Sequence, residues 1–211
     1  MTARIGFVSG AMLVLHILVG ISQAGEENGG HLGIAKVQPV SGRYVVVDGR
    51  FMIPYRATIP GTEITYEMTP IPAGRVVLGS PKDEPGRNAD EGPQIPVRIE
   101  AFWMGKYEIT WGEYRQYMAS YPAFKKFRIQ GIRKVTEKNK ADAITAPTVI
   151  YDPDYRYEHG SDPRMPAVSM TQYGAKQYTH WLSGITGRFY RLPSAAEWEY
   201  ACRAGSKSPF H

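Results

Sequence analysis

The sequence contains a single cysteine, Cys202, among its 211 residues. One cysteine excludes an intrachain disulfide framework and a cysteine-rich zinc module. His-x-x-x-His and Glu-x-x-His pairs are also missing, which argues against the common zinc-hydrolase arrangements. The chain has no G-x-S-x-G elbow, no Walker loop and no G-x-G-x-x-G run, so the frequent serine-hydrolase and nucleotide-binding motifs are absent too.

The composition that remains is that of an ordinary folded protein. Hydrophobic residues make up 43% and charged residues 21%, and aromatics reach 12%. Gly and Pro, with 22 and 16 residues, stay below the level of a low-complexity chain. This composition argues against disorder, collagen and a coiled coil, and the length allows one large domain or two small ones.

The first 24 residues have the three parts of a secretory signal peptide. Arg4 is their only charge, residues 11–21 form an apolar run, and Ser22-Gln23-Ala24 places small residues where cleavage occurs. We therefore expect export to the periplasm or the extracellular space. An uncleaved anchor is the alternative, because residues 5–21 are apolar overall. No later stretch is long and apolar enough to cross a bilayer, so we expect no stable membrane span after cleavage.

Basic residues concentrate at 125–140, where seven Lys and Arg residues accompany a single acid, Glu137. Such a run can attract nucleic acid or anionic lipid. A solvated helix face or an insertion loop is the favoured interpretation, because no nucleic-acid recognition motif accompanies the run. We therefore expect no nucleic-acid partner.

Turn and strand patterns organise the next part of the chain. Residues 25–43 are polar and Gly-rich, which predicts a linker. Residues 44–67 are predicted to form an N-terminal β-hairpin extension, because Asp48-Gly49 separates two runs of β-forming residues and suits a type I′ turn. Strands are also predicted at residues 64–68, 75–78, 97–99 and 103–109.

Three helices have start signals in which a Ser or Thr side chain caps the first turn. The expected starts are Thr110 with Glu113, then Ser169 or Thr171, then Ser194 with Glu197. The second helix is expected to end at Gly184 or Gly187 and the third at Gly205. Short strands, hairpins and a few helices without regular alternation predict an α+β fold, with 124–165 as a long irregular insertion.

Apolar spacing predicts which helix faces are buried. The expected buried residues are Trp111, Tyr114 and Met118 in the first helix, Gly174, Tyr178, Trp181, Leu182 and Ile185 in the second, and Trp198, Ala201 and Cys202 in the third. Cys202 lies late in its helix, where the dipole opposes a thiolate, so a buried structural thiol is favoured over a nucleophile.

Other polar clusters have both a chemical and a structural interpretation. Residues 152–162 collect oxygen ligands, but Arg156 and Tyr157 stand where an EF-hand needs a ligand and a glycine, so a polar surface loop is favoured over calcium binding. His159 and His180 are the mid-chain histidines, and His180 is expected to pack or to cap. Arg191 is expected to pair with Glu197 or Glu199 and to fix the turn into the third helix.

Residues 191–205, RLPSAAEWEYACRAG, resemble the block R-L-P-T-E-A-E-W-E-Y-A-x-R-G-G of the formylglycine-generating enzyme (sulfatase-modifying factor) family. Four more pieces follow the family's order, namely I-P-x-G…x-G-S at 71–80, E-x-P…V-x-V-x-x-F at 91–102, Y-E-V-T-x-x-E-Y at 107–114 and P-V-x-x-V-S-W at 166–170. The departures are Met170 where Trp is usual, Ala195 and Ala196 in the capping segment, and the insertion at 124–165.

The resemblance implies an irregular C-type lectin-like domain of the sulfatase-modifying factor type at 68–211. The family's catalytic cysteine pair and its calcium-binding loops come after the block at 191–205, and Cys202 matches a variable position within it. No catalytic, cofactor-binding or metal-binding residue is therefore assigned to this chain. Copper and calcium are implied by the family, with ligands expected beyond residue 211, and the domain is expected to be truncated at its C-terminal side.

Two functions are compatible with the resemblance. The first is an exported oxidase that converts a cysteine of a sulfatase or another protein to formylglycine with copper and O₂, and the family also includes iron-dependent sulfoxide synthases. The second is a non-catalytic lectin-like module that binds protein or glycan. Two nearby cysteines in the continuation of the reading frame would favour the first function, and their absence the second.

Overall fold

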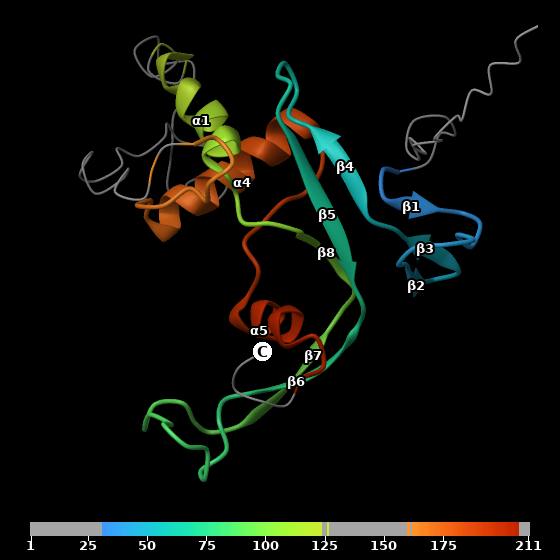
Figure 1. The fold of residues 1–211 in the computed structure, drawn as a ribbon, viewed down its shortest axis with the longest axis vertical. Coiled ribbons are helices and arrows are strands. Elements are labelled where there is room, and N and C mark those ends of the chain that lie inside the picture. Colours follow the sequence, from blue (N-terminus) through green and yellow to red (C-terminus); the bar gives the residue numbers. More distant parts are fainter. Residues whose placement is uncertain (1–30, 124–125, 127–159, 161, 207–211) are drawn as a thin grey trace, which may run out of the picture.

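The computed structural model describes residues 31–123, 126, 160 and 162–206 (Figure 1). The predicted signal peptide, nearly all of the basic run at 125–140 and most of 152–162, including His159, lie outside the described residues. The strands are β1 (Ile34–Ala35), β2 (Val45–Val47), β3 (Arg50–Met52), β4 (Tyr55–Thr58), β5 (Thr65–Ile71), β6 (Gly74–Leu78), β7 (Ile95–Ile99) and β8 (Phe102–Gly105). The helices are α1 (Trp111–Ala119), α4 (Gln172–Thr186) and α5 (Ala195–Arg203).

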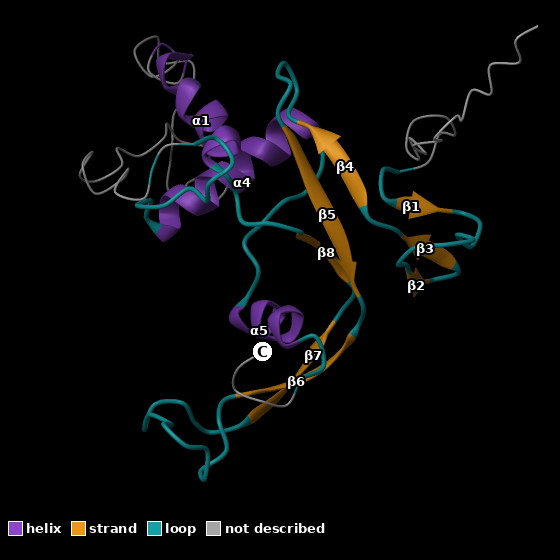
Figure 2. Ribbon diagram, in the orientation of Figure 1, coloured by secondary structure: helices purple, strands orange, loops and turns teal. Residues whose placement is uncertain are grey.

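A long bent hairpin forms the backbone of the fold. β5 continues into β6 through Pro72-Ala73, and β7 continues into β8, so that β6 pairs with β7 and β5 pairs with β8. β4 adds to the other edge of β5 and completes a sheet of order β4-β5-β8. Figure 2 shows this curved ribbon with α1 and α4 near one end and α5 beside β6 and β7. Small sheets with a few helices confirm the predicted α+β class.

The hairpin predicted around Asp48-Gly49 is present. β2 and β3 pair antiparallel, and both turn residues have positive φ, 49° at Asp48 and 72° at Gly49, as a type I′ turn requires. The preceding residues were expected to form a linker, but β1 lies there and pairs with β3. Gly33 makes this possible, because its φ is 83° and a Cβ at this position would lie 2.6 Å from the Tyr55 ring.

The three helices begin where their caps predict. Thr110 with Glu113 and Ser194 with Glu197 form complete capping boxes, and the Thr171 side chain accepts from Gly174 N. α4 ends at Gly187, which has a φ of 67°. Among the described residues, no helix is long and apolar enough to cross a membrane.

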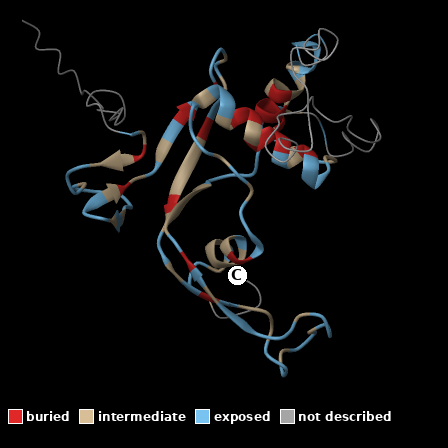
Figure 3. Cartoon of the chain, turned by 180° about the vertical axis from the view of Figure 1, so that it is seen from behind, coloured by how far each residue is buried: buried red, intermediate tan, exposed pale blue. Residues whose placement is uncertain are grey.

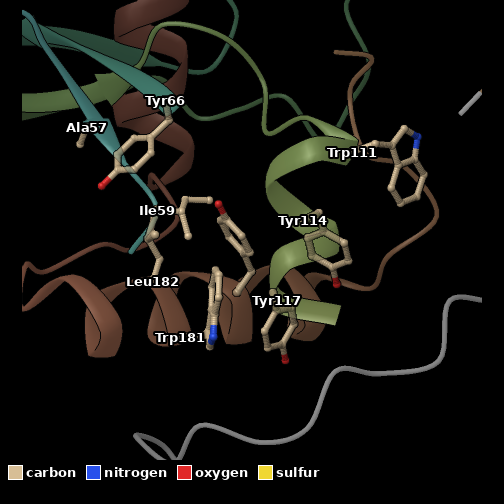
Figure 4. Packing of buried hydrophobic residues seen from close by; sticks show 9 residues of the cluster. Ala57, Ile59, Tyr66, Trp111, Tyr114, Tyr117, Trp181 and Leu182 are labelled. Carbon is tan, nitrogen blue, oxygen red and sulfur yellow. The ribbon is translucent and has the colours of Figure 1, made fainter. Parts of the chain in front are cut away.

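The main core lies where α1 and α4 pack on β4 and β5. Aromatic side chains dominate it, and Figure 3 shows the buried residues gathered at this end of the molecule. In Figure 4, Tyr117 of α1 lies next to Trp181 of α4, whereas Trp111 lies at the far side of α1. The predicted burial of Trp111 and Tyr114 is confirmed. Met118, also predicted to be buried, is only partly buried, and Tyr117, which was not predicted, is fully buried.

A second, smaller core joins α5 to the β6–β7 ribbon. Ala196 packs with Val76 and Ile99, and Tyr200 borders them. The predicted buried face of α5 is wrong, since Trp198 is 56% exposed and Cys202 is exposed. Ala196 and Tyr200 are four residues apart and share the helix face that packs on the β6–β7 ribbon. Trp198 lies two residues from each of them and therefore faces the opposite side, toward solvent.

The α1–α4 core predicts the stability effect of a single truncation. Leu182→Ala removes a buried side chain from this cluster and should lower the free energy of unfolding by about 2–5 kcal/mol. Ile185→Ala, one turn later in the same helix at a side chain that is 38% exposed, should cost less than about 1 kcal/mol. Urea unfolding followed by circular dichroism measures both variants. Equal losses would mean that α4 does not pack through the Leu182 face.

Candidate functional site

A cleft of about 660 Å³ lies between the central sheet and the segment that joins α4 to α5. Strand residues form one wall, with Tyr55 from β4, Met68 from β5 and residues 101–105 around β8. Residues 187–191 and Pro193 lie opposite these strands, and His31, Leu32 and Ile34 complete the lining. The cleft therefore collects segments that are far apart in sequence.

Three tyrosine hydroxyls form a chain at this cleft. Tyr66 Oη lies 2.7 Å from Tyr190 Oη, and Tyr190 Oη lies 3.5 Å from Tyr55 Oη. Burial, followed by the hydrogen bond to Tyr190, raises the pKa of both Tyr55 and Tyr66 above the ordinary value of 10.0. The positive charge of Arg188 opposes part of this rise in pKa. These two phenols therefore stay protonated at neutral pH and act as neutral hydrogen-bonding groups.

Backbone contacts after α4 hold Tyr190 in place. Its N–H donates to Ser183 Oγ over 2.8 Å, and the Ser183 hydroxyl donates to the Thr179 carbonyl over 2.7 Å. The left-handed Gly187 turns the chain at the end of α4. The Ser183 hydroxyl near the end of α4 thus fixes the irregular segment that carries Tyr190.

Arg191 and Glu197 form the ion pair expected at the turn into α5. The guanidinium donates to both carboxylate oxygens, Nη1 to Oε2 over 2.7 Å and Nη2 to Oε1 over 2.6 Å. Ser194 N also donates to Oε2 over 2.8 Å, which completes the capping box. The hydrogen bonds from Arg191 lower the pKa of Glu197 from its usual 4.5 to about 2. Glu199 pairs instead with Arg203, one turn along α5.

The tip of the long hairpin joins two of the sequence pieces quoted above. Ser80 Oγ donates to Glu91 Oε2 over 2.6 Å, and Ser80 N donates to the Glu91 carbonyl over 2.9 Å. A Cβ at Gly79 would lie 2.9 Å from the same carbonyl, so the glycine permits the approach. The G-S and E-x-P pieces are therefore the two sides of one loop.

The remaining candidates do not assemble into a catalytic group. Cys202 is exposed, which overturns the expected buried thiol. His180 lies within α4 and its Nδ1 is buried, without a hydrogen-bond partner among the described residues. Asp162 binds Arg164, as a polar surface loop would allow. Sequence patterns gave no sign of the tyrosine chain, because its members are separated by up to 135 residues.

Within the part of the chain that the structure describes, the residues do not fit the metals that the resemblance implies. Copper(I) needs soft thiolate ligands, and Cys202 is the only cysteine of the chain. Calcium needs several free oxygen ligands, but Glu91 and Asp162 are engaged by Ser80, Asn88 and Arg164. Within the described ranges, no three His, Cys, Asp or Glu side chains are grouped as metal ligands.

Comparisons with known proteins connect this arrangement to one family. Residues 57–210 match the family described as "Sulfatase-modifying factor enzyme 1-like domain". The chain is 29% identical over 157 residues to a formylglycine-generating enzyme of Bos taurus, covering 66% of this chain and 40% of that enzyme. It is 29% identical over 167 residues to a hercynine oxygenase of Mycolicibacterium thermoresistibile, covering 77% of this chain and 34% of that protein.

Among solved structures, PvdO from Pseudomonas aeruginosa aligns with a TM-score of 0.46 and 33% identity, over 68% of this chain and 49% of that one. The chain spans about two fifths of the length of the formylglycine-generating enzymes that it matches. The matched region begins at residue 57, upstream of the expected 68, and so includes the end of β4 and all of β5.

The Arg191–Glu197 pair predicts a pH-dependent contribution to stability. Because the pKa of Glu197 is lowered in the folded state, the stabilisation is complete above pH 4.5 and is lost as the pH falls toward 2. Glu197→Gln should lower the free energy of unfolding at pH 7 by about 1 kcal/mol, since Arg191 is half exposed. Glu199→Gln, which affects only an i,i+4 pair, should cost about 0.3–0.5 kcal/mol. Chemical unfolding at several pH values tests this, and a wild-type advantage over Glu197→Gln that persists at pH 2 would contradict it.

The hydroxyl chain predicts unequal costs for its members. Tyr190→Phe removes the partner of both other hydroxyls, including the short bond to the buried Tyr66, and should cost about 1–2 kcal/mol. Tyr55→Phe removes only the 3.5 Å contact and should cost less than about 0.5 kcal/mol. Thermal unfolding of the two variants measures the difference. Equal costs would show that Tyr190 does not hold the chain together.

Proposed function

The chain belongs to the family of sulfatase-modifying factor enzyme 1-like domains, and from this premise we propose that it is part of an exported oxidase that converts a protein cysteine to formylglycine with O₂. The match over residues 57–210 is the observation that carries the proposal. Two relatives named formylglycine-generating enzyme support this reaction, and one named hercynine oxygenase supports an oxidative reaction in general.

Under this proposal, the described residues supply scaffold and not reacting groups. The Arg191–Glu197 pair and the Ser194 cap fix the entry into α5, and the Ser80–Glu91 contacts fix the hairpin tip. Both features lie in the pieces of sequence that carry the family resemblance. The reacting thiols belong to sequence outside these 211 residues, since Cys202 is the only cysteine and the chain spans about two fifths of its relatives.

The proposal includes the organisation of the chain. Residues 1–24 act as a cleaved signal peptide, residues 25–43 are a connecting segment whose β1 already joins the folded part, and the domain continues past the described residues. A sulfatase or another exported protein is the substrate. Export would bring enzyme and substrate into the same oxidising compartment, which a thiol-directed oxidase with O₂ can use.

A non-catalytic recognition module is the second candidate, and one observation favours it. The cleft beside β8 is open and lined by aromatic side chains, including Trp103 and Phe189, and the latter is 83% exposed. Aromatic faces of this kind bind flat or apolar ligand surfaces. This function would need no thiol pair and would leave a substrate cysteine unchanged.

The two functions differ in what the complete protein does to a cysteine peptide. We expect the complete protein, loaded with copper and given a thiol reductant and O₂, to convert a sulfatase-type cysteine peptide to the aldehyde, as detected by mass spectrometry and an aldehyde-reactive probe. The 211-residue chain alone should give no aldehyde, because it holds a single thiol. Aldehyde formation by this chain alone would refute the proposed location of the thiols.

Cys202 provides a matched control in the complete protein. Cys202→Ser should leave the rate of conversion within about twofold of the wild type, because the thiol is exposed on α5 and takes no part in the proposed chemistry. An unchanged peptide with the wild-type protein, after copper loading has been verified, would favour the recognition module. Loss of conversion in Cys202→Ser alone would place the chemistry on α5.

A further inference from the structure

The tyrosine chain leaves one hydrogen-bond donor for a ligand. Each phenol carries one O–H, and the two contacts of the chain use two of the three hydrogens. When Tyr66 donates to Tyr190 and Tyr190 donates to Tyr55, the Tyr55 hydroxyl keeps its hydrogen. Tyr55 lines the cleft, whereas Tyr66 is buried behind it. With the donors in this order, the chain ends in a polarised O–H at the cleft wall, whereas the reverse order would leave the hydrogen on the buried Tyr66.

The charge of the cleft is positive. Arg188 lies in its lining, and none of the described residues that line it is Asp or Glu. Arg191 also lines the cleft, but its charge is neutralised by Glu197. Arg188 has no carboxylate within salt-bridge distance among the described residues, and its charge acts on the phenols of Tyr55 and Tyr66. A guanidinium and a phenol O–H that line the same cleft can both donate hydrogen bonds to the two oxygens of one carboxylate.

Rigid and exposed aromatic surfaces adjoin these polar groups. The Trp103 indole N–H donates to the Ile53 carbonyl over 3.0 Å, and its ring meets Tyr55 edge to face at 6.1 Å. These contacts hold the indole in place on β8. Phe189 lies next to Arg188 and is mostly exposed, so an apolar surface stands beside the cation. Exposed aromatic side chains at a cleft are typical of binding sites.

We propose that this cleft binds an organic carboxylate with a flat apolar body, with Arg188 and the Tyr55 hydroxyl on the carboxylate and Trp103 and Phe189 on the body. The site requires no metal and no cysteine, so it stands independently of the oxidase proposed above. Loss of oxidase activity would leave it intact, and failure of the site would leave the oxidase proposal unaffected.

A simple probe tests the site on the complete protein. We expect 3-phenylpropanoate to bind with a Kd of about 1 mM, a value normal for so small a ligand. Binding is followed by two-dimensional NMR, in which the indole N–H of Trp103 should shift. The neutral analogue 3-phenylpropanamide should bind at least about tenfold more weakly, because it lacks the charge. Equal affinity of acid and amide would overturn the proposal.

Variants distinguish this site from general attraction to a basic protein. Arg188→Gln should weaken binding about tenfold. Arg188→Lys should weaken it less, because Lys keeps the positive charge but cannot donate two parallel hydrogen bonds to the carboxylate. Tyr55→Phe should weaken binding about threefold. Arg98→Gln is the control, since Arg98 is exposed on β7 and pairs with Glu100 outside the cleft, and it should leave the Kd unchanged. An unchanged Kd in Arg188→Gln, or an equal loss in Arg98→Gln, would contradict the proposal.

Inorganic sulfate tests the apolar half of the site. If the flat body contributes, sulfate should bind at least about tenfold more weakly than 3-phenylpropanoate and should leave the Trp103 indole signal in place. Sulfate that binds as tightly as the aromatic acid would show a plain anion site and would overturn the role of Trp103 and Phe189. Probe-induced shifts centred on the hairpin tip at 79–94 would place binding elsewhere and would also overturn it.

Discussion

The aromatic contact between α1 and α4 is the interaction on which the rest of the structure depends. Tyr114 and Tyr117 of α1 lie against Tyr178 and Trp181 of α4, with ring centroids 5.7–6.1 Å apart in tilted and edge-to-face pairs. Each such pair adds roughly 0.5–1.5 kcal/mol to the burial of its surface. Two helices that are separated by more than fifty residues in sequence are thereby fixed as one unit against β4 and β5.

The cleft follows from the position of α4. Ser183 and Gly187 at the end of this helix direct the following residues back across the sheet, where Tyr190 meets Tyr55 and Tyr66. The same segment then enters α5 through the Arg191–Glu197 pair. One short connection therefore carries a hydroxyl of the chain, the cation Arg188 and the ion pair that begins the next helix. A small displacement of α4 would disturb all three, because packed interiors transmit strain.

The structure also explains why the family pieces recur together. The G-S and E-x-P pieces form opposite sides of the hairpin tip, and the R-L-P…E-W-E-Y block forms a capped helix start with its own counter-ion. Gly74, in the I-P-x-G piece, lets Tyr200 of the same block approach β6, because a Cβ there would lie 2.3 Å from the tyrosine oxygen. These pieces are contacts of one scaffold, and Arg191 and Pro193 of the last block also line the cleft.

The sequence alone determined the local features of this protein. Capping boxes at Thr110 and Ser194, the Asp48-Gly49 turn and the Arg191–Glu197 pair are all contacts within a few residues, where residue type dictates geometry. The family assignment was also within reach, because its block is contiguous. Tertiary structure decided the direction in which α5 turns, the ordering of β1 in an expected linker, and the meeting of Tyr55, Tyr66 and Tyr190. Those features depend on which distant surfaces pack together, and no periodicity within a short segment encodes that choice.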